Sequence, residues 1–295
     1  MRATRARSVA SSSDRSLFFC FGPAKSGTTL LQYALNLHPQ VSCPSEHNFT
    51  NLRASLGQVL AAYNETLGTV DRRTGGQGAT LVSVATGTQV FRAAVEAIVR
   101  QAAGDKSIMG ANDNSILRNL PLYDEVFEHP RMIAIFRNPI DQGLSGWHHN
   151  LRLAAEENDP RHRESLARHV DLAGWLRHRA AHFAATVRAF RAFAEQRDHV
   201  HAVRFEDLVV HRVQTLRRVF TFLGASADDV LLQPIVAATT LEAMRGRSRY
   251  PAFFRRGATD YGLHEVSPEL RRELLEQCAD AMAWLGYAQE GSEAG

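Results

Sequence analysis

This chain has few cysteines and no long hydrophobic run. These two absences disfavour disulfide-rich, zinc-binding and membrane-spanning classes of protein. Its three cysteines, Cys20, Cys43 and Cys278, are dispersed, and no C-x-x-C pair occurs. An odd number of scattered cysteines disfavours a disulfide framework and a zinc site, and is typical of a reducing compartment. No apolar stretch approaches the roughly 20 residues that cross a bilayer. We therefore predict a cytoplasmic protein without a membrane span.

A strong excess of one charge is also missing. The 34 basic and 31 acidic residues give a formal charge of +3, and the pI is near 8.9. Such a mild excess suits an anionic small ligand, but no dense basic stripe interleaved with aromatics indicates a nucleic-acid partner. With 44% hydrophobic and 22% charged residues, the composition is that of a soluble globular protein.

The organisation along the chain favours a single domain. Residues 1–15 are basic and Ser-rich, and the apolar run that follows them is too short for a signal peptide. We expect a flexible tail there, one domain over residues 16–288 and a short C-terminal tail over 289–295. Internal repeats and a convincing domain boundary are both missing.

Short apolar runs alternate with stretches of helical periodicity, which predicts an α/β fold with a parallel sheet covered on both faces. Residues 68–87, rich in Gly, Thr and Arg, are expected to form a long loop. The expected strands are Leu17–Phe21, Val41–Cys43, Ser107–Gly110, Arg131–Phe136 and Val200–Phe205. The expected helices are Thr28–Leu37, Thr88–Ala102, Gln142–Glu157, Leu166–Gln196, Val213–Leu223 and Pro268–Leu285.

The most informative segment is the loop between the first strand and the first helix, Gly22-Pro-Ala-Lys-Ser-Gly-Thr-Thr29. A glycine turn at a helix N-terminus presents free backbone N–H groups and the positive helix dipole to an anion. The loop nearly fits the P-loop pattern G-x-x-x-x-G-K-[ST], except that Thr28 occupies the lysine position and Lys25 lies inside the loop. A plain strand-to-helix turn without a ligand is the alternative.

A second candidate lies where the fourth expected strand ends. Arg137 directly follows that strand, and ligands of open parallel sheets bind beyond the carboxyl ends of the strands. Ser145 comes eight residues later, about two helical turns along the next helix. Strand end and helix together could bind one phosphate, since a guanidinium offers parallel N–H donors. Taken singly, a surface arginine and a helical serine would be the simpler interpretation.

A third candidate precedes the last helix, where Arg255, Arg256 and Gly257 are consecutive. A loop with two arginines and a glycine can fold over an anion and supply both charge and backbone donors. Exposed arginine pairs are common, so this signal is weak alone.

These motifs together resemble the sulfotransferases that use 3′-phosphoadenylyl sulfate (PAPS), particularly bacterial and glycan-type members. The segment Val203-Arg-Phe-Glu-Asp-Leu208, a later Phe222-Leu-Gly224 and Ser267-Pro-Glu269 are also similar to that family's motifs. All occur in the family's order and extend from about residue 17 to 287. The resemblance implies one sulfotransferase-like domain with a P-loop-type three-layer α/β/α sandwich and a central parallel sheet.

The resemblance also assigns roles. Lys25 would stabilise the 5′-phosphate that departs as 3′,5′-adenosine bisphosphate (PAP), and Phe205 would lie near adenine, with no metal required. The 5′-phosphate would be bound by Ala24, Lys25, Ser26, Gly27, Thr28 and Thr29. The 3′-phosphate would be bound by Arg137, Ser145, Arg255, Arg256 and Gly257.

A sulfuryl acceptor must lose a proton, so a base is required. One group of relatives uses a histidine where this chain has the neutral Asn112, whereas others place a glutamate after an HP-x-V motif. Glu46 follows His38-Pro-Gln-Val41 here and is our candidate base, with His47 as the next choice. Adjacent residues on a strand point opposite ways, so only one of them is expected to face the acceptor.

Three functions compete at this stage. The first is sulfuryl transfer to a hydroxyl, or an amine, of a small-molecule or glycan-like acceptor. The second is a P-loop kinase or nucleotide hydrolase, which predicts Mg²⁺-dependent ATP turnover and an acidic strand end. The third is a non-catalytic nucleotide-binding module. His148 and His149, next to Trp147, could line the acceptor side, although a solvated helix face is the favoured interpretation. The sequence carries no signal for the identity of the acceptor or the oligomeric state.

Overall fold

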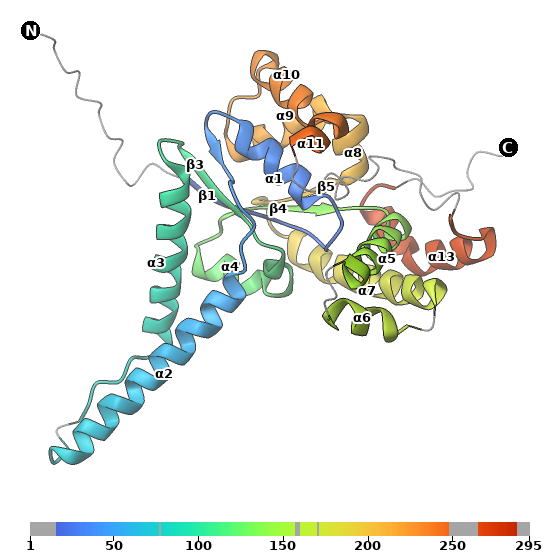
Figure 1. The fold of residues 1–295 in the computed structure, drawn as a ribbon. Helices are drawn as coiled ribbons and strands as arrows, with labels where there is room; N and C mark the ends of the chain where they lie inside the picture. The colour runs from blue at the N-terminus through green and yellow to red at the C-terminus, as the bar shows by residue number, and fades with distance from the viewer. Residues whose placement is uncertain (1–15, 77, 157–159, 170, 248–264, 288–295) are drawn as a thin grey trace, which may run out of the picture.

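A five-stranded, all-parallel sheet forms the centre of the computed structural model, which describes residues 16–76, 78–156, 160–169, 171–247 and 265–287 (Figure 1). The strand order is β2-β3-β1-β4-β5. The predicted α/β class and five strands are confirmed. The strands are β1 Ser16–Phe21, β2 Val41–Ser42, β3 Ile108–Asn112, β4 Arg131–Phe136 and β5 Val200–Arg204.

Strand β1 lies in the middle because its side chains are apolar on both faces. Its neighbours are β3, where Phe18 pairs with Gly110, and β4, where Phe18 pairs with Arg131. Phe19 and Phe21 enter one hydrophobic cluster while Phe18 and Cys20 enter the other. The alternation of a strand thus divides one apolar run between two cores.

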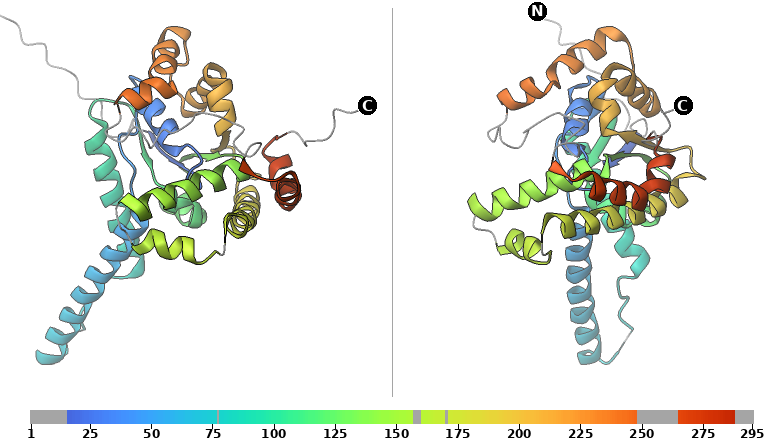
Figure 2. Two further views of the ribbon diagram at one scale, coloured as in Figure 1. Left: turned by 45° about the vertical axis from the view of Figure 1, so that its right-hand side comes forward. Right: turned by 90° about the vertical axis from the view of Figure 1, so that its right-hand side faces the viewer.

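Helices cover both faces of the sheet, giving the predicted three-layer sandwich (Figures 1 and 2). One face packs against α3, α4, α5, α7 and α13, and the other against α1, α8, α9 and α10. The helices are α1 Thr28–Leu37, α2 Phe49–Arg73, α3 Val84–Ala103, α4 Leu120–Val126, α5 Pro139–Glu156, α6 Pro160–Ala167, α7 Leu172–Ala194, α8 Phe205–Val210, α9 Arg212–Leu223, α10 Asp229–Ala238, α11 Leu241–Arg247 and α13 Pro268–Trp284, with a 3₁₀ helix η1 at Asn114–Arg118.

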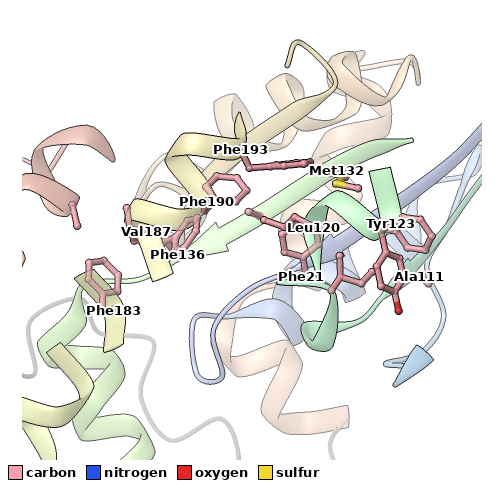
Figure 3. Packing of buried hydrophobic residues seen from close by; sticks show 14 of the residues in the cluster. Phe21, Ala111, Leu120, Tyr123, Met132, Phe136, Phe183, Val187, Phe190 and Phe193 are labelled. Atoms are coloured by element: carbon pink, nitrogen blue, oxygen red, sulfur yellow. The ribbon is translucent and has the colours of Figure 1, made fainter. Parts of the chain in front are cut away.

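Aromatic side chains fill the larger core, on the α7 side of the sheet (Figure 3). The ring of Phe190 lies 5.1 Å from that of Phe136 and 6.4 Å from that of Phe21. These contacts fix α7 beneath the strands that carry the site, because tightly packed rings tolerate little displacement.

Two expectations about the helices are wrong. Residues 68–87 are not one loop, because α2 runs to Arg73 and α3 begins at Val84. The side chain of Asn64 bonds both the backbone N–H and the carbonyl of Val82, which closes the two helices into a hairpin. The expected single helix over 166–196 is divided between α6 and α7, since Asp171 caps a new helix by accepting from the Gly174 N–H.

The outer part of α2, together with residues 74–76 and 78–83, extends away from the sheet as an arm, whereas α3 packs on the sheet through Phe91, Val95, Val99 and Ala103 (Figures 1 and 2). Phe49, at its base, is the only buried residue of the 25-residue α2. In the described part of the chain, no helix combines the length and apolar character needed to cross a membrane.

Candidate functional site

A cavity of about 1070 Å³ opens where the strands end, beyond their carboxyl ends. The β1–α1 loop forms its floor, α5 and α7 supply one wall, and α8, α9 and α11 supply another. Its described lining includes Ala24, Lys25, Gly27, Thr28, Thr29, Glu46, Asn114, Arg137, Ser145, His148, His149, Arg152, Trp175, Arg179, Phe205, Arg212 and Arg245.

The β1–α1 loop, which lines this cavity, has a backbone conformation typical of anion-binding turns. Lys25 has φ 72° and Gly27 has φ 94°, so the loop enters the left-handed region twice. A Cβ on Gly27 would lie 2.3 Å from Cδ2 of Phe205, so glycine is required for space as well as for conformation. Alternating backbone handedness at a helix N-terminus forms an anion-binding concavity.

Two amide side chains hold this loop in place. The Gln142 Nε2 donates to the Ala24 carbonyl at 2.9 Å and to the Ser26 Oγ at 3.3 Å. The Asn114 Oδ1 accepts from the Gly22 N–H at 3.1 Å. The loop is therefore fixed before any ligand binds, which reduces the entropy that binding must overcome.

Lys25 lines the cavity with a perturbed amine. Burial and the nearby Arg152 guanidinium lower the pKa of Lys25 to about 8, while the Glu46 carboxylate acts in the opposite direction. At pH 7 the amine remains mostly protonated, because its pKa is still above that pH. A cation that is partly desolvated and close to another cation favours binding of an anion.

Arg137, Ser145 and Phe205 all line the cavity. Arg137 is 6% exposed at the end of β4, and its guanidinium carbon lies 4.6 Å from the centre of the Phe205 ring. Its Nη2 is 3.9 Å from a carboxylate oxygen of Asp141. The structure thus brings together the strand-end arginine, the helical serine and the aromatic residue that the sequence singled out.

Glu46 and His47 lie on different sides of the same extended segment. Glu46 lines the cavity, and its carboxylate accepts from the Asn114 Nδ2 at 2.9 Å. His47 is not among the lining residues; its ring stacks on Phe49 with centroids 4.7 Å apart. Burial lowers the pKa of His47 from its ordinary value, while the nearby Asp113 carboxylate acts in the opposite direction. The expected opposite orientation of neighbours is present here, since Glu46 forms a parallel bridge with Asn112.

The predicted anion loop Arg255, Arg256 and Gly257 lies outside the described residues. The helix that follows begins as the sequence indicates, with the Ser267 Oγ accepting from the Leu270 N–H and Pro268 in the first turn.

Several lining residues escaped the sequence analysis. His148 and His149, expected on a solvated face, line the cavity instead. Burial, together with Lys25 and Arg152, lowers the pKa of His149 to about 4, which keeps its imidazole neutral. His149 follows Ser145 by four residues, a spacing that places both on neighbouring surface of one helix and could have identified it. No sequence pattern indicated that Gln142 and Asn114 hold the β1–α1 loop, because that role depends on contacts between residues far apart in the chain.

One group of potential metal ligands lies away from the cavity. Among the described residues, Asp124, His129 and His199 place their ligand atoms within 4.8 Å of one another. The Arg197 Nε donates to the Asp124 carboxylate at 2.9 Å, and His199 bonds its other oxygen at 2.7 Å. The carboxylate is therefore already paired with the Arg197 guanidinium and hydrogen-bonded to His199, which disfavours a metal there.

A parallel sheet whose central strand leads through a glycine-containing loop into a helix defines an α/β protein of the P-loop type, with a cationic cavity suited to nucleotide phosphates. Residues 18–229 match the model of the sulfotransferase family, and the chain belongs to that family. No curated protein sequence matches the chain at a significant level.

Solved structures share the fold at low identity. The mouse sulfotransferase SULT7A1 complexed with PAP is 15% identical, with 91% of this chain and 85% of that chain covered and a TM-score of 0.57. A sulfotransferase from Alicyclobacillus acidocaldarius is 21% identical, with 92% and 94% covered and a TM-score of 0.52. Both likenesses support the sandwich fold that the resemblance implied.

Proposed function

We propose that the protein transfers a sulfuryl group from PAPS to a hydroxyl, or an amine, of a small-molecule or glycan-like acceptor. The observation that carries the proposal is the grouping of Lys25, Arg137 and Glu46 around one cavity at the carboxyl edge of the sheet. Membership of the sulfotransferase family supports it, as does the PAP complex of the mouse relative.

The described residues fit a nucleotide with phosphates at two positions. Ala24 to Thr29 would bind the 5′-phosphate at the start of α1, where all of them except Ser26 line the cavity. The Ser26 N–H already donates to the Pro23 carbonyl at 3.1 Å, so Ser26 would act by shaping the loop. Arg137 and Ser145 would bind the 3′-phosphate, and Phe205 would contact the adenine, with Arg255, Arg256 and Gly257 proposed as further contacts. A cavity rich in cations makes such a multiply charged ligand favourable.

In this reaction an acceptor oxygen or nitrogen bonds to sulfur while the bond from sulfur to the 5′-phosphate oxygen breaks. Lys25 stabilises the electron pair that stays on this oxygen, because its ammonium donates a charge-assisted hydrogen bond. The Glu46 carboxylate takes the acceptor's proton. Asn114 holds that carboxylate, and through the Gly22 N–H it ties the base to the donor loop. None of these roles calls for a metal.

The kinase or hydrolase alternative finds no specific support. Such enzymes hold Mg²⁺ with an acidic residue near a strand end. Of the two strands beside β1, β4 leads into Arg137, and β3 leads into Asp113, whose carboxylate accepts from the Phe49 and Ser115 N–H groups and does not line the cavity. We therefore retain sulfuryl transfer as the proposed function.

The decisive experiment compares the binding of PAP and ATP by calorimetry, each with and without Mg²⁺. Sulfuryl transfer predicts a metal-independent preference for PAP. Preference for ATP with Mg²⁺ would support a kinase or hydrolase instead. If Lys25→Met weakened PAP binding but [³⁵S]PAPS gave no labelled product with any acceptor screened, the protein would be a binding module.

The base assignment is tested with Glu46→Gln and His47→Ala. We expect Glu46→Gln to reduce turnover about 10²–10⁴-fold with PAP affinity changed less than threefold, since general-base catalysis contributes that much. Turnover is measured as ³⁵S transfer from labelled PAPS to an acceptor found by screening hydroxyl compounds. Glu65→Gln, on the exposed arm, is the matched control. Loss of turnover in His47→Ala alone would reverse the assignment.

A further inference from the structure

The cavity holds more positive charge than the proposed donor contacts use. Its described lining has Glu46 as the one carboxylate, against the six cations Lys25, Arg137, Arg152, Arg179, Arg212 and Arg245. Lys25 and Arg137 are assigned to the two phosphates of the donor. These donor contacts therefore leave the positive charge of the other four arginines without an assigned ligand.

Arg179, on the α7 wall, is the most unusual of these cations. Its Nε is buried and has no hydrogen-bond partner among the described residues, and no described carboxylate acts on its guanidinium. The guanidinium carbon lies 5.9 Å from the centre of the Trp175 ring. Burial lowers the pKa of Arg179, although the group stays charged. A desolvated cation without a counter-charge is costly, and an anionic ligand would remove that cost.

The position of Arg179 separates it from the proposed 3′-phosphate contacts. A Cβ on Gly143 of α5 would lie 3.6 Å from the Arg179 Cβ, so α7 packs on the Gly143 flank of that helix. Ser145 follows by two residues, which rotates it about 200° around the helix axis. Arg179 and Ser145 therefore line the cavity from opposite flanks of α5.

Trp175 provides a fixed flat surface beside Arg179. Its indole Nε1 donates to the Gly143 carbonyl at 2.8 Å, and its ring lies 5.9 Å from that of Trp147. The indole is thereby locked, and an aromatic face next to a guanidinium suits a ligand that has both a ring and an anionic group.

We propose that the acceptor itself carries an anionic group, a carboxylate, phosphate or sulfate, which Arg179 binds beside Trp175 while the acceptor's hydroxyl or amine faces Glu46. This inference rests on the proposed function and specifies its substrate class. The charged end of the acceptor lies on the α7 wall, away from the donor's 3′-phosphate.

Calorimetry on the full chain saturated with PAP tests this with 4-hydroxybenzamide as the neutral probe. The anionic probes are 4-hydroxybenzoate, 4-hydroxyphenylphosphonate and 4-hydroxybenzenesulfonate, whose ranking identifies the preferred anion. Methyl β-glucuronide and its carboxamide form a second pair on a sugar scaffold. We expect at least one anionic probe to bind tenfold or more tightly than its neutral counterpart.

Arg179→Gln should abolish that preference, and Arg179→Lys should restore part of it. Arg177→Gln removes a cation from the same helix that is exposed and paired with Glu273, so the preference should remain. Equal binding of neutral and anionic probes on both scaffolds, or no binding of either series, would overturn the inference. So would an Arg179→Gln variant whose PAP affinity fell tenfold, since Arg179 would then hold the donor. Absence of PAP binding by the unsubstituted protein would instead refute the proposed function.

Discussion

The mostly buried β1–α1 loop and the exposed arm of α2 are two regions of the same molecule with opposite physical character. In the loop, Gly27 packs against Phe205, and Gln142 holds the adjoining backbone by hydrogen bonds. On the arm, the side chains of Val59 and Tyr63 are 64% and 53% exposed. One region is specified by contacts from distant elements, and the other mainly by its own helical hairpin.

Substitutions in these two regions should therefore have unequal effects on ligand binding and stability. Anchored loop residues act through geometry, so small substitutions there should affect ligand binding strongly. Exposed positions on the arm have few contacts to lose. Helix α2 begins at Phe49, whose N–H donates to the Asp113 carboxylate, so only the base of the arm is tied to the site.

The largest effect should come from Gly27→Ala. An alanine there is strained by its positive φ and would collide with Phe205, so we expect PAP affinity to fall about 100-fold, or ~2.7 kcal/mol. The matched control is Gly57→Ala on the arm, where a Cβ meets nothing within 4 Å. That change should leave PAP affinity intact and stabilise the helix by about 0.5–1 kcal/mol. An equal loss of PAP affinity in both variants would contradict the proposed difference between the loop and the arm.

Arg137→Ala should weaken PAP binding by about 1.5–3 kcal/mol, because it removes a charge-assisted contact. Affinity for adenosine 5′-phosphate, which lacks the 3′-phosphate, should change much less. Calorimetry with the two nucleotides gives the ratio, and Arg217→Ala removes a partly exposed arginine paired with Asp229 as the control. An unchanged ratio would remove Arg137 from the 3′-phosphate contacts.

The pH dependence of PAP affinity should report on Lys25. Its pKa of about 8 lies below the ordinary value, so the amine is cationic below that pH and its attraction for phosphate is lost as the pH rises. A bound phosphate raises this pKa, so we expect affinity to fall by roughly tenfold or less between pH 7.5 and 9.5. Lys25→Arg, which stays charged, should flatten the profile. The same slope in Lys25→Met would assign the titration to another group.

The smallest effect should come from the outer face of the arm. Val59→Ser and Tyr63→Ser should each change PAP affinity less than twofold and the free energy of unfolding by less than about 0.5 kcal/mol. Leu60→Ala is the contrasting variant, since Leu60 packs toward Gly87 of the facing helix, and we expect a loss of about 1–2 kcal/mol. Thermal denaturation measures all three. A large loss in Tyr63→Ser would show that its face is covered in solution.

Much of the fold and part of the candidate site could be predicted from the sequence. The apolar run before Gly22 identified the central strand, and the loop with Lys25 identified a segment that lines the cavity, because both signals are local. The arm was missed, since α2 is mostly polar and exposed and carries little of the apolar periodicity that marks a buried helix. Arg179 was missed for a different reason: nothing near it in the sequence shows that a cavity lies beside it.

The sequence by itself determined the sandwich class, the order of its elements and the chemistry of the loop around Lys25, because hydrophobic periodicity and glycine placement act over a few residues. Tertiary structure alone decided that Asn114 joins the donor loop to Glu46, that His47 turns to Phe49, and that Arg179 lies in the cavity wall. These contacts connect residues far apart in the chain, so packing of the sheet and its helices creates them.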